Sequence, residues 1–196
     1  MRAEIKDILG QVKRRHPRCA VRLAFVGYAD YQDTKPPGLD FTEESQLFID
    51  FLDALETKGG RDAAEDVFSG LAAAEGISWA SPHRILIHLA DNPCHGREFH
   101  DLVGDNADDF LDGDLHGRDA AALLEHLVHG CKLTTYTFIH LTKNTHKMLH
   151  RFRELLGAAL SRTQLHRMKV SWMHLVQVLC HGLSCTDAGA ASRLQW

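Results

Sequence analysis

Apolar residues recur along this chain with two alternating spacings, one typical of helices and the other of buried strands. In residues 1–17, the apolar side chains at Ile5, Ile8, Leu9 and Val12 follow helical spacing. This segment is therefore predicted to form one amphipathic helix, with the polar residues between them on its solvent-exposed face.

Two mostly apolar runs, at 20–27 and 84–90, are typical of strands buried in a sheet. A third strand is predicted at 133–141, which is rich in the β-forming residues Thr, Tyr, Phe and Ile. A shorter strand is predicted at 39–42. Helical spacing predicts four further helices, at 43–55, 62–75, 119–129 and 144–156. Because strands and helices alternate, we predict an α/β protein with a doubly wound, mostly parallel open sheet and helices on both faces.

The segment 157–196 does not continue this alternation. From Ser161 onwards it holds four basic residues and one acidic residue, and its apolar residues have no clear period. We therefore expect a structured domain over 1–156 and a divergent, poorly ordered tail over 157–196.

The composition narrows the class of protein. With 196 residues, of which 44% are apolar, the chain can form the core of one domain. A net charge of −4 provides no field that attracts nucleic acid. The N-terminal segment lacks the apolar core of a signal peptide, and the apolar stretch 170–183 is too short to span a bilayer. We expect a soluble cytoplasmic protein that binds neither nucleic acid nor membrane.

Acidic side chains follow the predicted strands at the points where these strands end. Asp30 and Asp33 lie in the loop after the first apolar strand, and Asp91 directly follows the second. Asp62 and Glu65 lie where a glycine-rich loop leads into a helix. In an open parallel sheet, ligands bind at the carboxyl ends of the strands, and clustered carboxylates there favour Mg²⁺, Ca²⁺ or Mn²⁺. The alternative is that each acid caps a loop or a helix N-terminus.

A segment with cysteine and histidine follows one of these acids. Cys94, His95 and His100 could supply three zinc ligands, but adjacent residues rarely bind one ion and the chain has no CxxC pair, so we expect no zinc site. A nucleophilic Cys94–His95 pair is disfavoured because sequence neighbours normally point apart. The chain has no phosphate-binding loop and no kinase signature. We expect that it is not an enzyme.

The chain contains, in order, the strings VRLAFVGYADYQD, LDFTEESQLFIDFLDALETKGGRDAAEDVFSGL, RILIHLADNPCHGREFHD and GDLHGRDAAALLEHLVHGCKLTTYTFIHLTKNTHKMLHRFREL. With these segments, residues 1–156 resemble the von Willebrand factor A domain of the type linked to alpha-type protein kinases. The resemblance implies a doubly wound, Rossmann-like sheet that carries a metal-ion-dependent adhesion site.

By this resemblance, Asp62 matches the middle element of the metal site and Asp91 matches its last element. Asp30 and Glu65 are candidate additional ligands. The DxSxS element that should follow the first strand of such a domain is absent from this sequence. We therefore expect the site to be incomplete and to bind Mg²⁺ or Ca²⁺ only weakly.

The absent element would also include the central first strand of the sheet. Without it, the strands 20–27 and 84–90 lose a shared neighbour, and each would present unpaired backbone N–H and C=O groups. The two strands would either close up against each other, or the protein would be longer at its N-terminus.

The resemblance implies a protein-binding module. We expect a protein partner to bind the rim at the carboxyl ends of the strands, formed by Tyr28, Asp30, Asp33, Asp91, Asn92 and His95. Two alternatives stay open. One is a truncated or degenerate gene product without independent activity, and the other is a regulatory partner of an alpha-type protein kinase.

Overall fold

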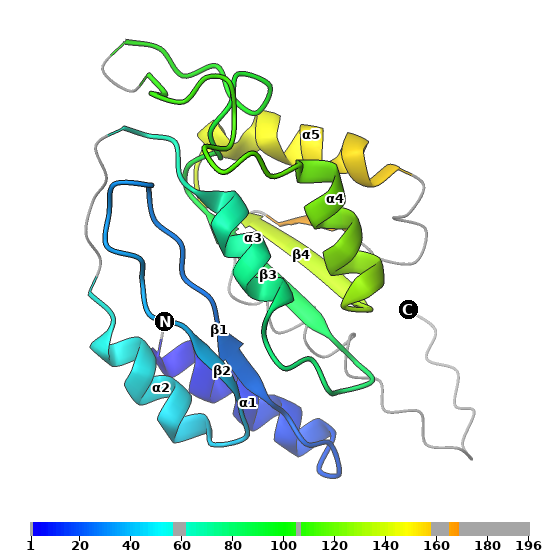
Figure 1. Ribbon diagram of the computed structural model, residues 1–196. Helices are drawn as coiled ribbons and strands as arrows, with labels where there is room; N and C mark the ends of the chain where they lie inside the picture. Colours follow the sequence, from blue (N-terminus) through cyan, green and yellow to red (C-terminus); the bar gives the residue numbers. More distant parts are fainter. Residues whose placement is uncertain (1, 57–61, 105–106, 158–164, 169–196) are drawn as a thin grey trace.

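A computed structural model describes residues 2–56, 62–104, 107–157 and 165–168 of the chain (Figure 1). In chain order its elements are α1 (Arg2–Arg15), β1 (Leu23–Phe25), β2 (Leu39–Thr42), α2 (Ser45–Ala54), α3 (Val67–Glu75), β3 (Ile85–Ala90), α4 (Ala120–Glu125), η2 (His126–Gly130), β4 (Thr135–His140), η3 (Lys143–Thr145), α5 (His146–Leu156) and β5 (Leu165–Met168). The short element η2 is a π-helical turn that continues α4, and η3 is a 3-10 turn that leads into α5.

The described strands form two sheets in place of the single open sheet that the sequence predicts. β1 pairs antiparallel with β2, whereas β4 lies between β3 and β5 in a parallel sheet. The β3–β4 ladder runs in register from Ile85 opposite Thr135 to Ala90 opposite His140. The described residues therefore form a mixed α/β structure with a small parallel sheet. Within them, β1 and β3 have not closed up into one ladder.

Most predicted elements are confirmed, and two are shorter than expected. The strand predicted at 20–27 is reduced to β1, because its register with β2 shifts between Leu23 and Phe25 and its other edge has no described partner. The helix predicted at 62–75 begins only at Val67. Asp66 caps it, since its side chain accepts a hydrogen bond from Ser69 N at 2.9 Å, and residues 62–66 are left as a turn.

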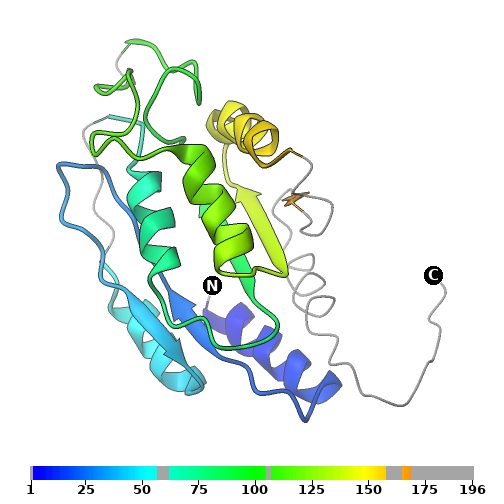
Figure 2. The same cartoon turned by 45° about the vertical axis from the view of Figure 1, so that its right-hand side comes forward.

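The core lies between the parallel sheet and the helices α3, α4 and α5. Tyr136 and Phe138 of β4 are fully buried there, together with Leu124 of α4 and Phe152 of α5. α3 and α4 lie side by side over one face of this sheet in both views (Figures 1 and 2). The β1–β2 ribbon packs separately against α2. The two parts of the fold meet at the carboxyl ends of β1 and β3, where the Tyr28 hydroxyl donates to Leu89 O, and again at the opposite end, where Asp40 of β2 accepts from Ser78.

The strand β5 falls in the segment 157–196 that we expected to be a tail, and its pairing with β4 runs from Tyr136 opposite Leu165 to Ile139 opposite Met168. The rest of that segment lies outside the described residues, so its boundary stays a prediction. In the described part of the chain, no helix has the length and apolar character needed to cross a membrane.

Candidate functional site

The rim at the carboxyl ends of β1 and β3 is built from three segments that are tied together by their backbones. The turn before α3 meets the loop after β3, because Glu65 N donates to Pro93 O at 2.9 Å and Glu65 forms a parallel bridge with Cys94. The loop after β1 joins them through Tyr28, whose hydroxyl donates to Leu89 O at 3.1 Å. The carboxylates of all three segments are thereby held at one end of the molecule.

His95 lies at the centre of this rim, between two buried carboxylates. Its Nε2 lies 3.1 Å from Asp30 Oδ1, and its Nδ1 lies 2.7 Å from Asp108 Oδ1. His95, Asp30 and Asp108 are 1%, 4% and 4% exposed. A neutral imidazole carries one N–H, so two carboxylates at its two nitrogens can both accept a hydrogen bond only when the ring is a cation.

Asp108 accepts hydrogen bonds from several groups of the site. Besides His95, its carboxylate accepts from Gly96 N at 2.8 Å, from Phe110 N at 2.7 Å and from His100 Nε2 at 2.8 Å. Burial by itself would raise the pKa of Asp108, but these hydrogen bonds outweigh it and hold the pKa below its usual value. Asp108 is therefore a fixed negative charge that orients both histidines.

Asp62 completes a group of three side chains that could hold a metal ion. Ligand atoms of Asp30, Asp62 and His95 all lie within 4.8 Å of one another. The carboxylate of Asp62 also accepts from Ala64 N at 3.0 Å and from Asp109 N at 2.9 Å. Burial, and after it the charge of Asp30, raises the pKa of Asp62 in spite of these backbone hydrogen bonds. Excess negative charge in this group is the condition that favours a bound cation.

The other predicted metal ligands lie beside this group. Asp91 is exposed and is not a member of the group, although the sequence paired it with Asp62. Glu65 is half-buried; burial first, and then the carboxylates of Asp30, Asp91 and Asp33, raise its pKa to about 7. The structure thus places all five predicted acids within electrostatic reach of one rim, and it brings Asp30 and Asp62 closest to His95.

The remaining predicted rim residues have structural contacts of their own. Tyr28 packs against α3, where a Cβ on Gly70 would come within 2.7 Å of its ring. Asp33 closes a turn, its N–H donating to Asp30 O at 3.0 Å. Asn92 accepts from Asn144 Nδ2 at 3.1 Å through its side-chain oxygen, which ties the rim to η3.

Cys94 is buried beneath the rim rather than presented on it. Its N–H donates to Met148 Sδ at 3.1 Å, and burial raises the pKa of its thiol well above the usual value. A protonated, enclosed thiol is a poor nucleophile. His95 and His100 both bond Asp108, and within the described residues Cys94 does not join them in a ligand group.

A second network fixes the long connection between β3 and α4, and sequence reasoning did not find it. Arg118 donates to Asp114 Oδ1 at 2.6 Å, to Asp66 Oδ1 at 2.9 Å and to Ser69 Oγ at 2.7 Å. Tyr31 donates its hydroxyl to Asp114 at 2.9 Å. Its ring stacks on that of His95 with centroids 4.5 Å apart. Nothing in the acidic run 105–114 distinguishes Asp108 or Asp114 from its neighbours, so no local signal pointed to these residues.

Comparison with known proteins gives a partial match. No protein-family model matches the chain. The chain is 28% identical over 131 residues to the alpha-protein kinase vwkA of Dictyostelium discoideum, and the aligned part covers 65% of this chain. The chain spans about a fifth of the length of that kinase, since the aligned part covers 20% of it. The chain is therefore a partial homologue of an alpha-protein kinase, and the finer resemblance to a von Willebrand factor A domain stays a prediction.

Proposed function

We propose that the chain is a protein-binding module of the von Willebrand factor A type, without catalytic activity, that engages its partner through the rim. The observation that carries this proposal is the gathering of Asp30, Asp33, Asp62, Glu65 and Asp91 at one end of the fold, around the buried His95. The carboxylates of this rim give it negative charge, and the buried His95 below them is held by hydrogen bonds. Such a surface complements a partner with basic side chains, or a partner whose carboxylate binds the same cation as the rim.

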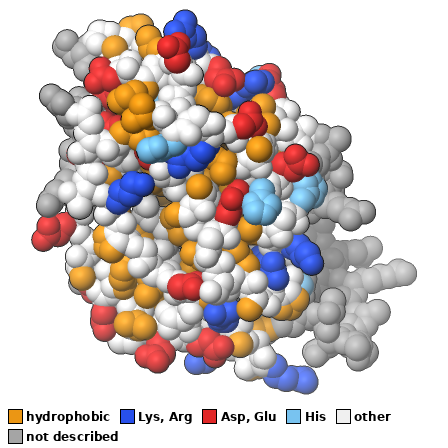
Figure 3. All heavy atoms as spheres, viewed as in Figure 1, with side chains coloured by type: hydrophobic (Ala, Val, Ile, Leu, Met, Phe, Trp, Pro, Cys, Tyr) orange, Lys and Arg blue, Asp and Glu red, His pale blue; other side chains and the backbone are white. Residues whose placement is uncertain are grey.

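Apolar side chains beside the rim support the same proposal. Leu111 and Leu115 of the long connection are 44% and 57% exposed, and Leu115 N donates to the hydroxyl of Tyr31. Figure 3 shows acidic and hydrophobic side chains next to one another at the upper end of the molecule, where this connection lies. Exposed apolar side chains rimmed by polar residues are found at protein–protein interaction sites.

The similarity to vwkA favours an alpha-type protein kinase as the class of partner, on which the chain would act in trans as a regulatory subunit. The test measures binding of the purified chain to purified vwkA by biolayer interferometry in the presence of Mg²⁺. Charge reversal at the rim, Asp33→Arg with Asp91→Arg, is expected to weaken binding at least tenfold. The matched control is Asp112→Arg, since Asp112 is fully exposed and lies outside the group around His95.

The outcomes separate the parts of this proposal. Equal binding by the rim variant and the wild type would contradict the rim as the binding surface. No binding of vwkA at all would contradict an alpha-type kinase as the partner class.

The proposed cation at this rim is Mg²⁺ or Ca²⁺, held weakly by Asp62 and Asp91 or by Asp62 with Asp30, with Glu65 as an additional ligand. Isothermal titration of the chain with MgCl₂ is expected to show no affinity in the micromolar range. Micromolar binding would contradict the proposal of an incomplete site.

The alternative of a degenerate gene product is tested by unfolding. A continuous buried core that joins α3, α4, β4 and α5 supports a protein that folds. We expect one cooperative thermal transition, seen at the same temperature by circular dichroism and by tryptophan fluorescence. A broad, non-cooperative change would favour the degenerate product.

A further inference from the structure

The second half of the long connection between β3 and α4, residues 107–118, forms a strap over the rim. The strap contains no helix and no strand, and more than half of its residues are exposed. Figures 1 and 2 show the connection beyond the N-terminal end of α3, at the end of the molecule where the rim lies. A segment that buries so little of itself is held in place by the few contacts that it makes with the rest of the fold.

The strap contacts the three side chains that could hold a metal ion. Asp109 N donates to Asp62 Oδ2 at 2.9 Å, and Asp108 Oδ1 lies 2.7 Å from Nδ1 of His95. In this arrangement His95 and Asp30 are only 1% and 4% exposed. The strap therefore helps to close this group off from solvent.

The carboxylates of the group accept hydrogen bonds while the strap is closed. Asp30 Oδ1 accepts from Tyr31 N at 2.6 Å, and Asp62 Oδ1 accepts from Ala64 N at 3.0 Å. Of the hydrogen bonds that Asp62 accepts in the described structure, only the one from Asp109 N comes from the strap. A backbone N–H directed at Asp62 Oδ2 competes with a cation for that oxygen. The closed strap therefore does not fit a metal ion bound at Asp62.

Electrostatic repulsion opposes the closed position of the strap. The strap carries four carboxylates and one arginine, and it lies against a rim that is itself acidic. The carboxylates of the strap are those of Asp108, Asp109, Asp112 and Asp114, and those of the rim are Asp30, Asp33, Asp62, Glu65 and Asp91. Because like charges at these short separations repel, the strap stays closed only through specific hydrogen bonds.

Two side chains make most of these hydrogen bonds. The hydroxyl of Tyr31, from the loop after β1, donates to Asp114 Oδ1 at 2.9 Å and accepts from Leu115 N at 2.9 Å. The carboxylate of Asp108 bonds His95 and also lies 2.8 Å from Nε2 of His100. Tyr31 thus holds the C-terminal half of the strap, and Asp108 holds its N-terminal half.

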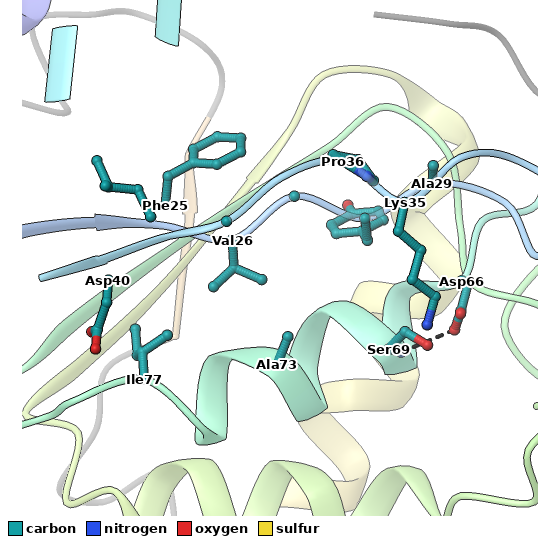
Figure 4. Close-up of a pocket in the computed structure, with 14 residues that line it drawn as sticks. Phe25, Val26, Ala29, Lys35, Pro36, Asp40, Asp66, Ser69, Ala73 and Ile77 are labelled. Atoms are coloured by element: carbon teal, nitrogen blue, oxygen red, sulfur yellow. Dashed lines mark hydrogen bonds between the residues drawn. The ribbon is translucent and has the colours of Figure 1, made fainter. Parts of the chain in front are cut away.

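The C-terminal end of the strap is fixed to α3 independently of these bonds. Arg118 donates to Asp66 Oδ1 at 2.9 Å and to Ser69 Oγ at 2.7 Å. Figure 4 shows Asp66 and Ser69 next to each other at the start of α3, joined by a hydrogen bond. The neighbouring Gly117 has a φ of +67° and open space where a Cβ would be. Such a glycine can serve as the hinge of the strap.

We propose that the strap is autoinhibitory: Tyr31 and Asp108 hold it closed, and it lifts to admit a divalent cation to the group below. Lifting frees Oδ2 of Asp62 and withdraws Asp108 from His95. The inference rests on the proposed function, because it takes the rim as the cation site, and it adds a second cause of weak binding to the absent DxSxS element. Since the closed strap and the cation exclude each other, each weakens the binding of the other by the same factor.

The first experiment follows the strap in the wild-type chain by amide hydrogen exchange and NMR. The two reporting amides are those of Asp109, bonded to Asp62, and of Leu115, bonded to Tyr31. Titration with MgCl₂ into the millimolar range is expected to speed their exchange at least threefold. The amide of Ala122, which Asp119 caps in α4, is the control and should not change. Slower or unchanged exchange at both reporting amides would overturn the proposal, because a cation that enters under the strap must lift it.

The second experiment releases the strap and measures cation binding. The double variant Tyr31→Phe with Asp108→Asn keeps the shape of both side chains but removes the hydroxyl and the charge that hold the strap. Mn²⁺ is the probe, and its free concentration is followed by electron paramagnetic resonance. The double variant is expected to bind Mn²⁺ at least tenfold more tightly than the wild type. Asp112→Asn is the matched control, since it removes a strap charge whose side chain is fully exposed, and its affinity should equal that of the wild type.

The outcomes separate the strap from the cation site. Equal Mn²⁺ affinity of the double variant and the wild type would overturn the autoinhibitory role, and continued protection of the Asp109 amide in the double variant would overturn Tyr31 and Asp108 as the groups that hold the strap. Adding Asp62→Asn to the double variant should abolish the gain. A gain that survives would contradict the rim as the cation site, and so the proposed function itself. If the double variant does not fold, Tyr31→Phe alone decides the outcome, with an expected gain of at least threefold.

Discussion

The hydroxyl of Tyr28 lies 3.1 Å from Nε2 of His88, and this contact joins the loop after β1 to the buried face of β3. Nδ1 of His88 lies 2.9 Å from the hydroxyl of Tyr136 on β4. One arrangement of hydrogens satisfies the whole chain: Tyr136 donates to His88, His88 donates to Tyr28, and Tyr28 donates to Leu89 O. A neutral histidine thus connects the two sheets.

Removing the Tyr28 hydroxyl should loosen this connection. Tyr28→Phe keeps the ring against α3 but leaves a nitrogen of His88 and the carbonyl of Leu89 without their partner. Leaving such groups unsatisfied costs about 1–3 kcal/mol. We expect a loss of that size in urea unfolding followed by circular dichroism, with an unchanged m-value. A loss below about 0.5 kcal/mol would mean that water replaces the hydroxyl at no cost.

Acidification should destabilise the protein through His88. Burial lowers the pKa of His88 to about 4, from 6.5 in the unfolded chain. The groups that face it, Tyr28, Tyr136 and Phe138, bring no negative charge that would offset this. Between these pH values the unfolded state binds more protons, so the contribution of His88 is present above pH 6.5 and is lost as the pH falls toward 4. The full shift corresponds to about 3 kcal/mol.

The measurement is urea unfolding at intervals from pH 7 to pH 4. His88→Gln cannot titrate in this range, so its stability should fall less steeply than that of the wild type. His150→Gln is the matched control, because its side chain is 75% exposed, and it should keep the wild-type slope. Identical slopes for His88→Gln and the wild type would show that other groups govern acid unfolding.

We expect that only glycine fits at position 70, because the ring of Tyr28 fills the space that a larger side chain would need. A Cβ at this position would lie 2.7 Å from a ring carbon and 3.0 Å from Cβ of Tyr28. Gly70→Ala gains up to about 1 kcal/mol of helix propensity, but forcing the ring aside costs about 1–3 kcal/mol. We expect a net loss of stability in thermal unfolding, together with weaker protection of the amides of β3.

Gly10→Ala is the matched control for this substitution. Gly10 also lies in a helix, α1, and its nearest neighbour is the flexible end of Arg14 at 3.3 Å. This change should leave the stability unchanged or raise it by up to about 1 kcal/mol. If Gly70→Ala behaved in the same way, the ring of Tyr28 would have room to move.

The sequence predicted those parts of the fold that depend on local patterns. β3 was found because it is a mostly apolar run, typical of a strand with two covered faces, and β4 because it is rich in β-branched and aromatic residues. The extent of β1 was not predicted, because the ends of a strand depend on its partners. In the described structure β1 pairs with β2 alone, and the register between them shifts within three residues. A run of apolar residues does not show which neighbours are present.

The candidate site was predicted in the same uneven way. Asp30, Asp62 and His95 were all placed near the rim, because Asp30 and His95 lie in the loops after two predicted strands and Asp62 lies at the start of a predicted helix. Asp108 was missed, because it lies in the long connection between β3 and α4 and contacts His95 only when that connection folds back over the rim. The path of that connection depends on contacts between residues distant in sequence. The position of Asp91 outside the group around His95 likewise depends on side-chain direction, which spacing along the chain does not define.

The long connection itself should depend on the planar guanidinium of Arg118. This group bonds both oxygens of Asp114 and also reaches Asp66 at the N-terminus of α3. Arg118→Lys keeps the charge but cannot bridge both acids with the same fork of donors. We expect a loss of about 1 kcal/mol, because the group is partly exposed to solvent, and at least tenfold faster tryptic cleavage after Arg97. Arg151→Lys is the matched control, since its partners Glu98 and Glu154 are half or more exposed. Unchanged cleavage in Arg118→Lys would show that the buried pair of Asp108 and His95 holds the connection without the help of Arg118.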